Sequence, residues 1–187
     1  MKEYEDYFKY LRKRSKLGYL YRKWWLYPFL CRHLEGKVLD VGCGIGDMLS
    51  YRPNTTGVDV NPSTVKYCRK IGLDALEMKP DRLPFDNDVF DGAILDNVME
   101  HIEDPATLLS EINRVLVNNG KLVVGVPGKK GFKWDTDHKV FYDIKTLKGV
   151  MKASGFIYNK HFYMPLKLDI LDNLLRQYCL YSVFNAE

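Results

Sequence analysis

Short apolar runs rich in Val, Ile and Leu alternate along this chain with stretches in which apolar residues recur every three or four positions. The runs are typical of buried strands and the longer stretches of amphipathic helices, so their alternation predicts an α/β fold with a mainly parallel sheet. At 187 residues the chain is long enough to bury one good core. We expect seven strands, at residues 38–41, 55–60, 73–78, 89–95, 121–126, 156–163 and 178–184.

Helices are predicted between these strands, and two of them have clear start signals. Asn61 and Asp104 suit the N-cap position, and the prolines that follow them, Pro62 and Pro105, suit the first helical position. The loop at residues 127–138 follows the fifth strand and is expected to face a substrate. The predicted helices cover residues 46–51, 62–71, 105–117, 143–154 and 168–176.

Two further helices, at residues 3–16 and 19–34 with Gly18 between them, are predicted before the first strand. Residues 1–35 contain nine Lys and Arg but only four Asp and Glu, so this segment accounts for the net charge of +4 of the whole chain. It is also rich in Tyr and Trp. Basic and aromatic residues together suit a membrane surface, a nucleic acid or an anionic substrate. The alternative is a helical cap whose aromatic rings pack on the sheet.

The first strand leads into three glycines at alternate positions, in the run Asp40-Val41-Gly42-Cys43-Gly44-Ile45-Gly46-Asp47. A strand that breaks into glycines before a helix makes a cradle for a nucleotide, because glycine permits a tight turn and close approach of a ligand. The dinucleotide fingerprint requires Gly or Ala three residues after Gly44, where this chain has Asp47. No Gly-Lys-Ser/Thr follows, which excludes a P-loop.

This Asp-x-Gly-x-Gly-x-Gly spacing resembles the first motif of the class I S-adenosylmethionine-dependent methyltransferases. The resemblance implies a doubly wound, Rossmann-like sheet of seven strands with an antiparallel last strand, and S-adenosylmethionine as the cofactor. The sulfonium and ammonium groups of this cofactor suit a carboxylate, so Asp40 is expected at its methionine end, directly or by shaping the loop. The simpler alternative is that Asp40 only caps the glycine turn. The expected loop contacts are Gly42, Cys43, Gly44 and Gly46.

Contacts for the ribose and the adenine are expected at the next two strand ends. Asp59, followed by Val60, closes the second strand and can accept both ribose hydroxyls. The family pattern Gly-Asp-Ala-Glu before Leu-Pro-Phe is replaced here by Met78-Lys79-Pro80-Asp81. Lysine has no acceptor for the adenine amine. The adenine is therefore read by backbone groups of Met78 and Lys79, or by Asp81.

The segment after the fourth strand, Asp96-Asn97-Val98-Met99-Glu100-His101, resembles the family's Leu-Glu-His-Val-x-Asp-Pro segment. In open α/β sheets the carboxyl ends of the strands line the ligand crevice, so Asp96, Asn97 and Val98 are expected beside the cofactor. His101 is a candidate base, although a histidine at this position also commonly forms only local hydrogen bonds.

The loop after the fifth strand ends in His138-x-x-Phe141-Tyr142, which resembles the type-11-like small-molecule methyltransferases. His138 is the stronger candidate base, because transfer to a hydroxyl needs removal of a proton near neutral pH. Its alternative role is to anchor the loop. Asp135, Asp137 and His138 carry metal-ligating atoms, but Asp-x-Asp-His in a turn is more typical of capping. No metal is therefore expected.

The resemblance implies a single methyltransferase domain over residues 1–187, with a Rossmann-like core at 35–187 and a helical lid at 1–34 that the sheet does not need. The predicted reaction is O-methylation of a small-molecule or glycan acceptor in polysaccharide or natural-product biosynthesis. An anionic or lipid-linked acceptor, or peripheral contact with a membrane, would suit the basic aromatic lid. Two alternatives stay open: ribose methylation of RNA, and a non-catalytic partner protein that only binds the cofactor.

Some functions are disfavoured by what the sequence lacks. The Asn/Asp-Pro-Pro-Tyr/Phe signature of base-methylating enzymes is absent after the fourth strand, so a nucleic-acid substrate is not favoured. No apolar run approaches the ~20 residues of a membrane span, and the first residues are too polar for a signal peptide. The four cysteines show no paired spacing, which fits reduced thiols in a cytoplasmic protein. The oligomeric state is not indicated.

Overall fold

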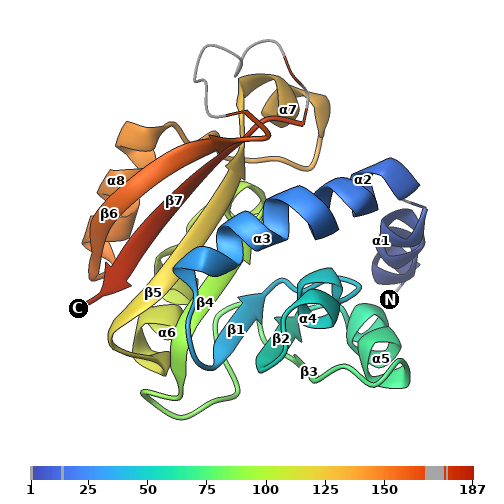
Figure 1. The fold of residues 1–187 in the computed structure, drawn as a ribbon, viewed down its shortest axis with the longest axis horizontal. Coiled ribbons are helices and arrows are strands. Elements are labelled where there is room, and N and C mark those ends of the chain that lie inside the picture. Colours follow the sequence, from blue (N-terminus) through green and yellow to red (C-terminus); the bar gives the residue numbers. More distant parts are fainter. Residues whose placement is uncertain (1, 14, 167–174, 176) are drawn as a thin grey trace.

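A single seven-stranded sheet runs through the computed structural model, which describes residues 2–13, 15–166, 175 and 177–187 (Figure 1). The strand order is β3-β2-β1-β4-β5-β7-β6. Strands β1 to β5 pair in parallel, and β7 is antiparallel to both of its neighbours, β5 and β6. This confirms the predicted doubly wound sheet with an antiparallel last strand. The strands are β1 (Val38–Val41), β2 (Thr55–Asp59), β3 (Ala75–Glu77), β4 (Phe90–Asp96), β5 (Leu116–Pro127), β6 (Phe156–Met164) and β7 (Cys179–Ala186).

Helices cover both faces of the sheet (Figure 1). The N-terminal helices, α4 and α5 lie on one face, and α6 and α8 lie on the other. The order of the strands reverses between β1 and β4, and a crevice at the carboxyl ends of these strands is the usual ligand site of such sheets. After the first strand the helices are α4 (Asp47–Tyr51), α5 (Pro62–Lys70), α6 (Ala106–Val115), α7 (Lys129–Trp134) and α8 (Ile144–Ala153), with a 3-10 turn at Met99–His101.

Side chains of the strands alternate between the two faces of the sheet, and each face has its own large core. Leu39 and Val41 of β1 join the larger core, under α6 and α8. Val38 belongs to the smaller core, under the N-terminal helices. Because side chains of a strand alternate between faces, Asp40 shares the face of Val38. The sequence therefore places one carboxyl group on the side of the sheet that the N-terminal segment covers.

The N-terminal segment breaks earlier than the sequence predicts. Helix α1 (Lys2–Arg12) ends before Ser15, and the Ser15 side chain accepts a hydrogen bond of 3.0 Å from the amide of Gly18. Ser15 is therefore the N-cap of α2 (Lys16–Tyr21), and the expected break at Gly18 is wrong. The helical course continues through a π-helix (Arg22–Leu26), α3 (Tyr27–Leu30) and a 3-10 turn (Cys31–His33).

The second half of the predicted lid belongs to the core. Leu26, Tyr27 and Leu30 are buried against β1, β4 and β7, so removal of residues 1–34 would uncover apolar surface of the sheet. The boundary of the lid therefore needs a correction, because only α1 stands apart from this core. Trp24 and Trp25 remain exposed.

Several other element boundaries differ from the prediction. Helix α6 ends at Val115, and residues 118–120, predicted as a turn, lie inside β5 with a register shift against β4. Strand β3 is shorter than predicted, and the loop after β5 contains the short helix α7. The helix predicted at residues 168–176 falls outside the described residues, apart from Leu175. Among the helices described, none has the length and apolar character needed to cross a bilayer.

Candidate cofactor and acceptor site

The glycine loop after β1 adopts a backbone that only glycine tolerates well. Gly42, Gly44 and Gly46 have φ angles of 78°, 54° and 77°, in the left-handed region that L-residues with side chains avoid. A Cβ atom on Gly42 would also lie 2.5 Å from Cγ2 of Val98. The loop and the segment after β4 therefore approach each other as closely as the backbone allows, which places Val98 at the crevice as predicted.

Three carboxyl groups gather on one face at the carboxyl ends of β1, β2 and β4. Asp40 pairs with Gly57 and Ile94 in the register of the sheet, and Asp59 and Asp96 follow these two partners by two residues. Alternation then puts all three carboxyl groups on the same side of the sheet. All three have pKa values above the ordinary range, mainly because burial disfavours their charged forms.

Asp59 organises the glycine loop while keeping acceptor capacity. Its two oxygens accept hydrogen bonds of 2.8 Å from the amides of Gly44 and Asn61. Each carboxylate oxygen has a second lone pair, so two ribose hydroxyls can still be accepted. Val60, the next residue, is exposed at the end of the strand. This arrangement fits the role predicted for Asp59.

Asp40 is buried, and hydrogen bonds at this end of the sheet go to the carboxyl groups of its neighbours Asp59 and Asp96. Burial first, and then the negative charges of Asp96 and Asp59, raise its pKa to about 8. A carboxyl group held without a donor or a counterion is costly. A ligand cation at this position would relieve that cost, which is the role predicted for Asp40 toward the ammonium group of the cofactor.

Asp96 is held by two groups, one of which the sequence gave no reason to select. The hydroxyl of Tyr181 on β7 donates a hydrogen bond of 2.9 Å to its Oδ1 atom. The side-chain amide of Asn97 donates a hydrogen bond of 2.8 Å to the same oxygen. Gly125 provides the room, because a Cβ atom there would lie 2.4 Å from both Asp96 and Tyr181. The positive charge of Arg22 lowers the pKa of Asp96 and so offsets part of the increase that burial causes.

Arg22 is a second residue that sequence reasoning missed. It begins the π-helix, and its Nε atom is buried without a hydrogen-bond partner among the described residues. Such π-helical turns are frequent at functional sites. The available signal was weak, because Arg22 is one of nine basic residues in its segment.

Cys43 faces away from the crevice. Its amide donates to the carbonyl of Val58, its carbonyl accepts from Gly46, and its side chain is buried beside Leu49. A hydrogen bond with the thiol of Cys68 raises the pKa of Cys43. The thiol of Cys43 therefore packs beneath the loop, and a contact between Cys43 and the cofactor stays a prediction.

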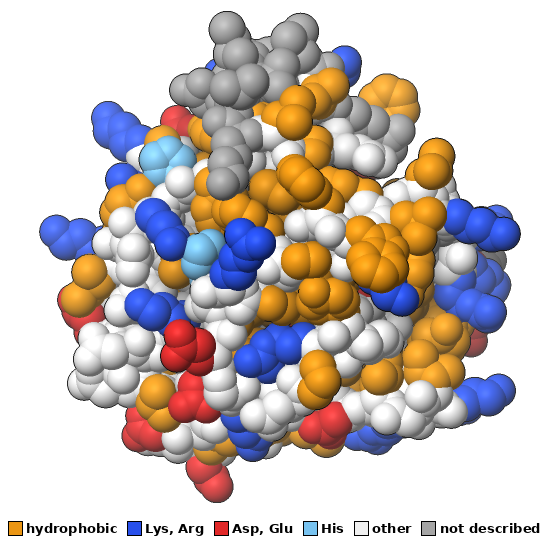
Figure 2. All heavy atoms as spheres, viewed as in Figure 1, with side chains coloured by type: hydrophobic (Ala, Val, Ile, Leu, Met, Phe, Trp, Pro, Cys, Tyr) orange, Lys and Arg blue, Asp and Glu red, His pale blue; other side chains and the backbone are white. Residues whose placement is uncertain are grey.

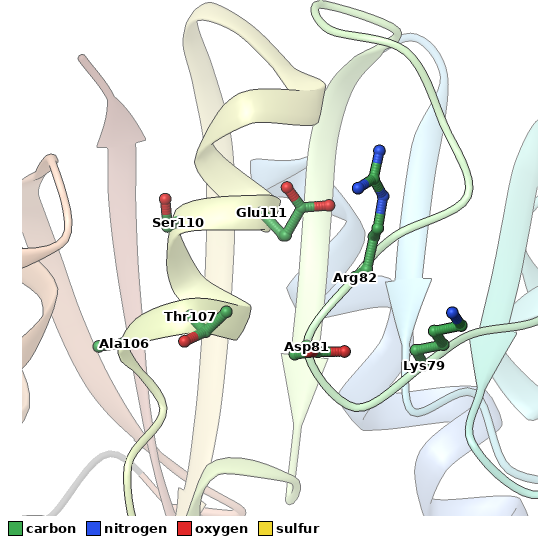
Figure 3. A pocket seen from close by; sticks show the side chains of 7 residues that line it. All are labelled: Lys79, Asp81, Arg82, Ala106, Thr107, Ser110 and Glu111. Atoms are coloured by element: carbon green, nitrogen blue, oxygen red, sulfur yellow. The ribbon is translucent and has the colours of Figure 1, made fainter.

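At the adenine end, backbone groups of Met78 and Lys79 also hold the loop. The amide of Met78 donates to the carbonyl of Asp59, and the carbonyl of Lys79 accepts from Arg82. A carbonyl oxygen that accepts one hydrogen bond keeps a second lone pair, so reading of the adenine by these backbone groups stays a prediction. Lys79 and Asp81 line a hollow of about 650 Å³ between the β3–β4 loop and α6, shown in Figure 3. Of the groups predicted to read adenine, the Asp81 carboxylate keeps the most acceptor capacity.

The two candidate bases come together in the structure, with a third residue that the sequence did not single out. The rings of His101 and His138 lie 4.8 Å apart, centre to centre. Nε2 of His138 lies 3.8 Å from Oε1 of Glu100, whose side chain is buried. Burial raises the pKa of Glu100 to about 8 and lowers the pKa of His101. Near neutral pH, His101 therefore presents an uncharged imidazole.

The acidic residues before His138 act as caps, as the sequence predicts. Oδ1 of Asp135 accepts a hydrogen bond of 3.0 Å from the amide of Asp137. The other oxygen of Asp135, Oδ2, lies 4.0 Å from Nε2 of His138. This turn therefore holds His138 over the crevice while leaving one carboxylate oxygen close to its ring.

Helix α1 covers the glycine loop. A Cβ atom on Gly44 would lie 3.4 Å from Leu11, and the Asn61 side chain donates a hydrogen bond of 2.9 Å to the carbonyl of Tyr4. Partial burial, and then the negative charges of residues that include Asp59, raise the pKa of Tyr7 to about 12. The helix thus packs across the crevice, where it can close over a ligand.

Comparison with known proteins identifies the domain. The family model described as "Methyltransferase domain" matches residues 39–124, which include the glycine loop, Asp59 and Asp96. This part of the chain matches a methyltransferase domain, and the order of its strands is that of the class I S-adenosylmethionine-dependent methyltransferases. S-adenosylmethionine is the cofactor of these methyltransferases.

Two curated relatives illustrate the similarity in sequence. "Uncharacterized protein MJ1123" of Methanocaldococcus jannaschii is 28% identical over 139 residues, which cover 74% of this chain and 66% of that protein. "Ubiquinone/menaquinone biosynthesis C-methyltransferase UbiE" of Citrifermentans bemidjiense is 34% identical over 149 residues, 70% of this chain and 62% of that protein. This chain therefore spans less than two thirds of the length of these relatives.

Solved structures agree in fold. A putative methyltransferase from Haloferax volcanii, solved in complex with the Trm112 methyltransferase activator, has a TM-score of 0.78 at 18% identity. The match covers 98% of this chain and 97% of that one. A possible histamine N-methyltransferase from Thermotoga maritima has a TM-score of 0.75 at 18% identity, with both chains covered completely. At this identity the likeness shows the fold alone.

Proposed function

We propose that this protein transfers the methyl group of S-adenosylmethionine to a hydroxyl oxygen of a small-molecule or glycan acceptor with an apolar or lipid-linked portion. The observation that carries this proposal is the group of Glu100, His101 and His138 at the carboxyl end of β4. These three follow Val98, which packs on the glycine loop. A hydroxyl acceptor needs a group that removes its proton or stabilises the negative charge that develops on its oxygen. An amine with a free lone pair needs no such group.

The residues around the glycine loop are assigned to parts of the cofactor by their chemistry. Asp40 takes the ammonium group, because a cation beside its buried carboxyl group would offset the cost of that burial. Arg22, whose charge reaches Asp96, takes the methionine carboxylate. Asp59 takes the ribose hydroxyls, and Asp81 takes the adenine amine. The bound sulfonium supplies an electrophilic methyl group and leaves as a neutral thioether.

The protein itself contributes alignment and a place for the proton. The acceptor oxygen has to meet the methyl carbon in line at roughly 3 Å as the carbon–sulfur bond breaks. The hydroxyl proton is then taken by the Glu100, His101 and His138 group, in which Nε2 of His138 lies beside Glu100. Helix α1 covers the crevice and limits access of water to the methyl group.

An apolar portion of the acceptor is supported by the surface of α2 and the π-helix. Leu17, Leu20 and Trp24 recur at helical spacing and are 78%, 46% and 70% exposed. Figure 2 shows hydrophobic side chains across the middle of this side of the molecule, with Lys and Arg side chains among and around them. An exposed apolar face of this kind is typical of contact with a lipid or another apolar partner.

Two curated relatives are named for enzymes of lipid-like compounds. Besides UbiE, "Phthiotriol/phenolphthiotriol dimycocerosates methyltransferase" of Mycobacterium leprae is 33% identical over 118 residues. These names describe those proteins, and they support a search for the acceptor among hydroxylated apolar molecules.

The test is a methyl-transfer assay with S-adenosylmethionine that carries a labelled methyl group. The acceptor panel contains prenylated phenols, lipid-linked sugars, free nucleotide sugars and short RNA. We expect transfer to a phenolic or sugar hydroxyl of an apolar acceptor, and loss of that transfer in the Leu17→Ser, Trp24→Ser double variant. Transfer to RNA ribose or to a ring carbon, with none to a hydroxyl of the other acceptors, would refute the proposal.

A further inference from the structure

Glu100, His101 and His138 bring three metal-ligating atoms together. One nitrogen from each histidine and one carboxylate oxygen all lie within 4.8 Å of one another. Two of the residues come from the 3-10 turn after β4, and the third comes from the loop after α7. Two imidazoles and a carboxylate are a common ligand set for divalent transition metals.

Backbone carbonyls fix the orientation of both imidazoles. Nδ1 of His138 lies 3.0 Å from the carbonyl oxygen of Phe132, and Nδ1 of His101 lies 3.3 Å from that of Asp137. A carbonyl oxygen only accepts hydrogen bonds, so the proton of each neutral ring lies on Nδ1. Each Nε2 atom then carries a lone pair. Metal-binding histidines are oriented by this same contact, in which the second ring nitrogen donates to a carbonyl or carboxylate.

Glu100 completes a group of acceptors that lack a donor. Its side chain is 1% exposed, and neither Oε1 nor Oε2 has a hydrogen-bond partner among the residues that the structure describes. Its nearest ring atom, Nε2 of His138 at 3.8 Å, offers another lone pair in this tautomer. Buried carboxylates are normally paired with hydrogen-bond donors, a charge or a metal. A cation between these atoms would satisfy all three.

We infer that Glu100, His101 and His138 bind a divalent transition-metal ion such as Zn²⁺ or Mn²⁺. Zinc lies about 2.0–2.2 Å from nitrogen and oxygen ligands, so a tetrahedral set has its donor atoms about 3.4 Å apart. The three side chains reach this spacing through shifts of about 1 Å in their terminal atoms, within the range of small side-chain torsions. Oδ2 of Asp135, 4.0 Å from Nε2 of His138, is within reach as a further ligand.

This inference deepens the proposed O-methylation and rests on it only for its functional consequence. An open coordination position on the ion can take the acceptor hydroxyl and make that group more acidic. With the ion bound, the three side chains are its ligands, so the proton passes to solvent water instead of to them. The oxygen forms its bond to the methyl carbon as the carbon–sulfur bond breaks. The alternative is that the three residues hold only a proton, shared between Glu100 and His138.

Metal binding is tested directly, without any acceptor. The full-length protein is freed of metal with EDTA, dialysed and titrated with Co²⁺ while the visible absorption of cobalt is recorded, and Zn²⁺ is then added in competition. We expect one equivalent of Co²⁺ to bind with a spectrum of nitrogen and oxygen ligands. A thiolate-to-cobalt charge-transfer band would place the ion on cysteines and would overturn the inference.

Matched variants locate the site. Glu100→Gln keeps the size of the side chain, and His138→Asn replaces the ring with a smaller polar group that lacks Nε2. Each should weaken Co²⁺ binding at least tenfold. His161→Asn, a change on the outer strand β6, should leave it unaltered. Unchanged binding in both site variants, or no binding by the wild-type protein, would show that the cluster holds only a proton.

Activity separates this inference from the proposed function. Methyl transfer to a hydroxyl that persists in excess EDTA, in a protein that binds no Co²⁺, removes the metal and leaves O-methylation standing. Stoichiometric Co²⁺ binding that Glu100→Gln abolishes, in a protein that methylates no hydroxyl, establishes the metal site and refutes O-methylation.

Discussion

The hydroxyl of Tyr181 donates a hydrogen bond of 2.9 Å to Oδ1 of Asp96. This contact joins the antiparallel strand β7 to the cofactor end of β4, across the intervening strand β5. A strand that completes the sheet therefore also fixes one of the three carboxyl groups of the site.

Tyr181→Phe should weaken cofactor binding without unfolding the protein. The phenyl ring keeps its stacking contact with Phe162, at 5.8 Å between ring centres, but Asp96 loses a donor. The side chain of Asn97 still donates to the same oxygen, so the cost is that of one lost hydrogen bond, about 0.5–1.5 kcal/mol. We expect a loss of that size, shared between the free energy of unfolding and the affinity for adenosylhomocysteine. Denaturation and isothermal titration measure the two parts, and an unaltered affinity would exclude Asp96 from the binding site.

Adenosylhomocysteine should stabilise the protein, and NAD should not. The glycine loop has Asp47 where a dinucleotide site needs a small residue. A ligand at 100 times its dissociation constant adds about 2.7 kcal/mol to the free energy of unfolding. Thermal unfolding with each ligand measures this difference. Gly44→Val is the matched control, because its φ of 54° and the nearby Leu11 leave no room for a branched side chain. A shift with NAD alone would contradict the assignment.

The affinity for S-adenosylmethionine should rise with pH through the titration of Asp40. Its pKa is raised to about 8, so at lower pH the carboxyl group is protonated and offers no charge to the ammonium group. Below about pH 8 the affinity should fall by up to about tenfold per pH unit. Isothermal titration between about pH 6.5 and about pH 9 measures this slope, which Asp40→Asn should flatten. A slope that persists in the variant would assign it to another group.

The same residue has the opposite effect on the stability of the cofactor-free protein. Between about pH 4 and about pH 8 the folded protein holds a proton that the unfolded chain releases, so the free energy of unfolding falls as the pH rises. Asp40→Asn should therefore be more stable than the wild type at about pH 8 in the absence of cofactor. Urea denaturation at the two ends of this range gives the comparison.

Removal of residues 1–13 should leave a folded protein that turns over poorly. Helix α1 contacts the glycine loop and α5 through Leu11 and Tyr4, and it contributes no residue to either large core. Loss of this cover should reduce methyl transfer sharply while adenosylhomocysteine still binds, because alignment and exclusion of water are lost. A soluble truncated protein with full activity would end the lid hypothesis.

Leu30→Ala is the comparison for that truncation. Leu30, the last residue of α3, is fully buried, and a change of this kind costs about 2–5 kcal/mol. We expect the variant to lower the free energy of unfolding but to leave the activity of the folded fraction largely intact. Together, the truncation and Leu30→Ala distinguish the role of α1 as a lid from the role of the buried part of the N-terminal segment in the core.

The sheet and the glycine loop could be predicted from the sequence because their signals are local. A run such as Val38–Val41 followed by spaced glycines determines a strand and a turn together, and Asp59 follows at the end of the next strand. Glu100 was missed because its partner, His138, is far along the chain and the fold alone brings them together. Tyr181 was missed for the same reason, since nothing near it in sequence indicates Asp96.

The N-terminal boundary was misjudged because two local signals competed. Gly18 is a weak helix residue, but the side chain of Ser15 caps the following turn and places the break before it. The burial of Leu30 could not be told from its spacing, because an amphipathic stripe packs on a sheet and on a ligand equally well.

The packing of Leu11 against Gly44 has a kinetic consequence. The lid hypothesis places the cofactor at the loop that α1 covers. On that hypothesis, we expect each catalytic cycle to include the undocking and return of α1. The rate of product release then depends on how tightly α1 is held, so substitutions at Leu11 or Tyr4 can change the turnover number while the chemical step stays the same.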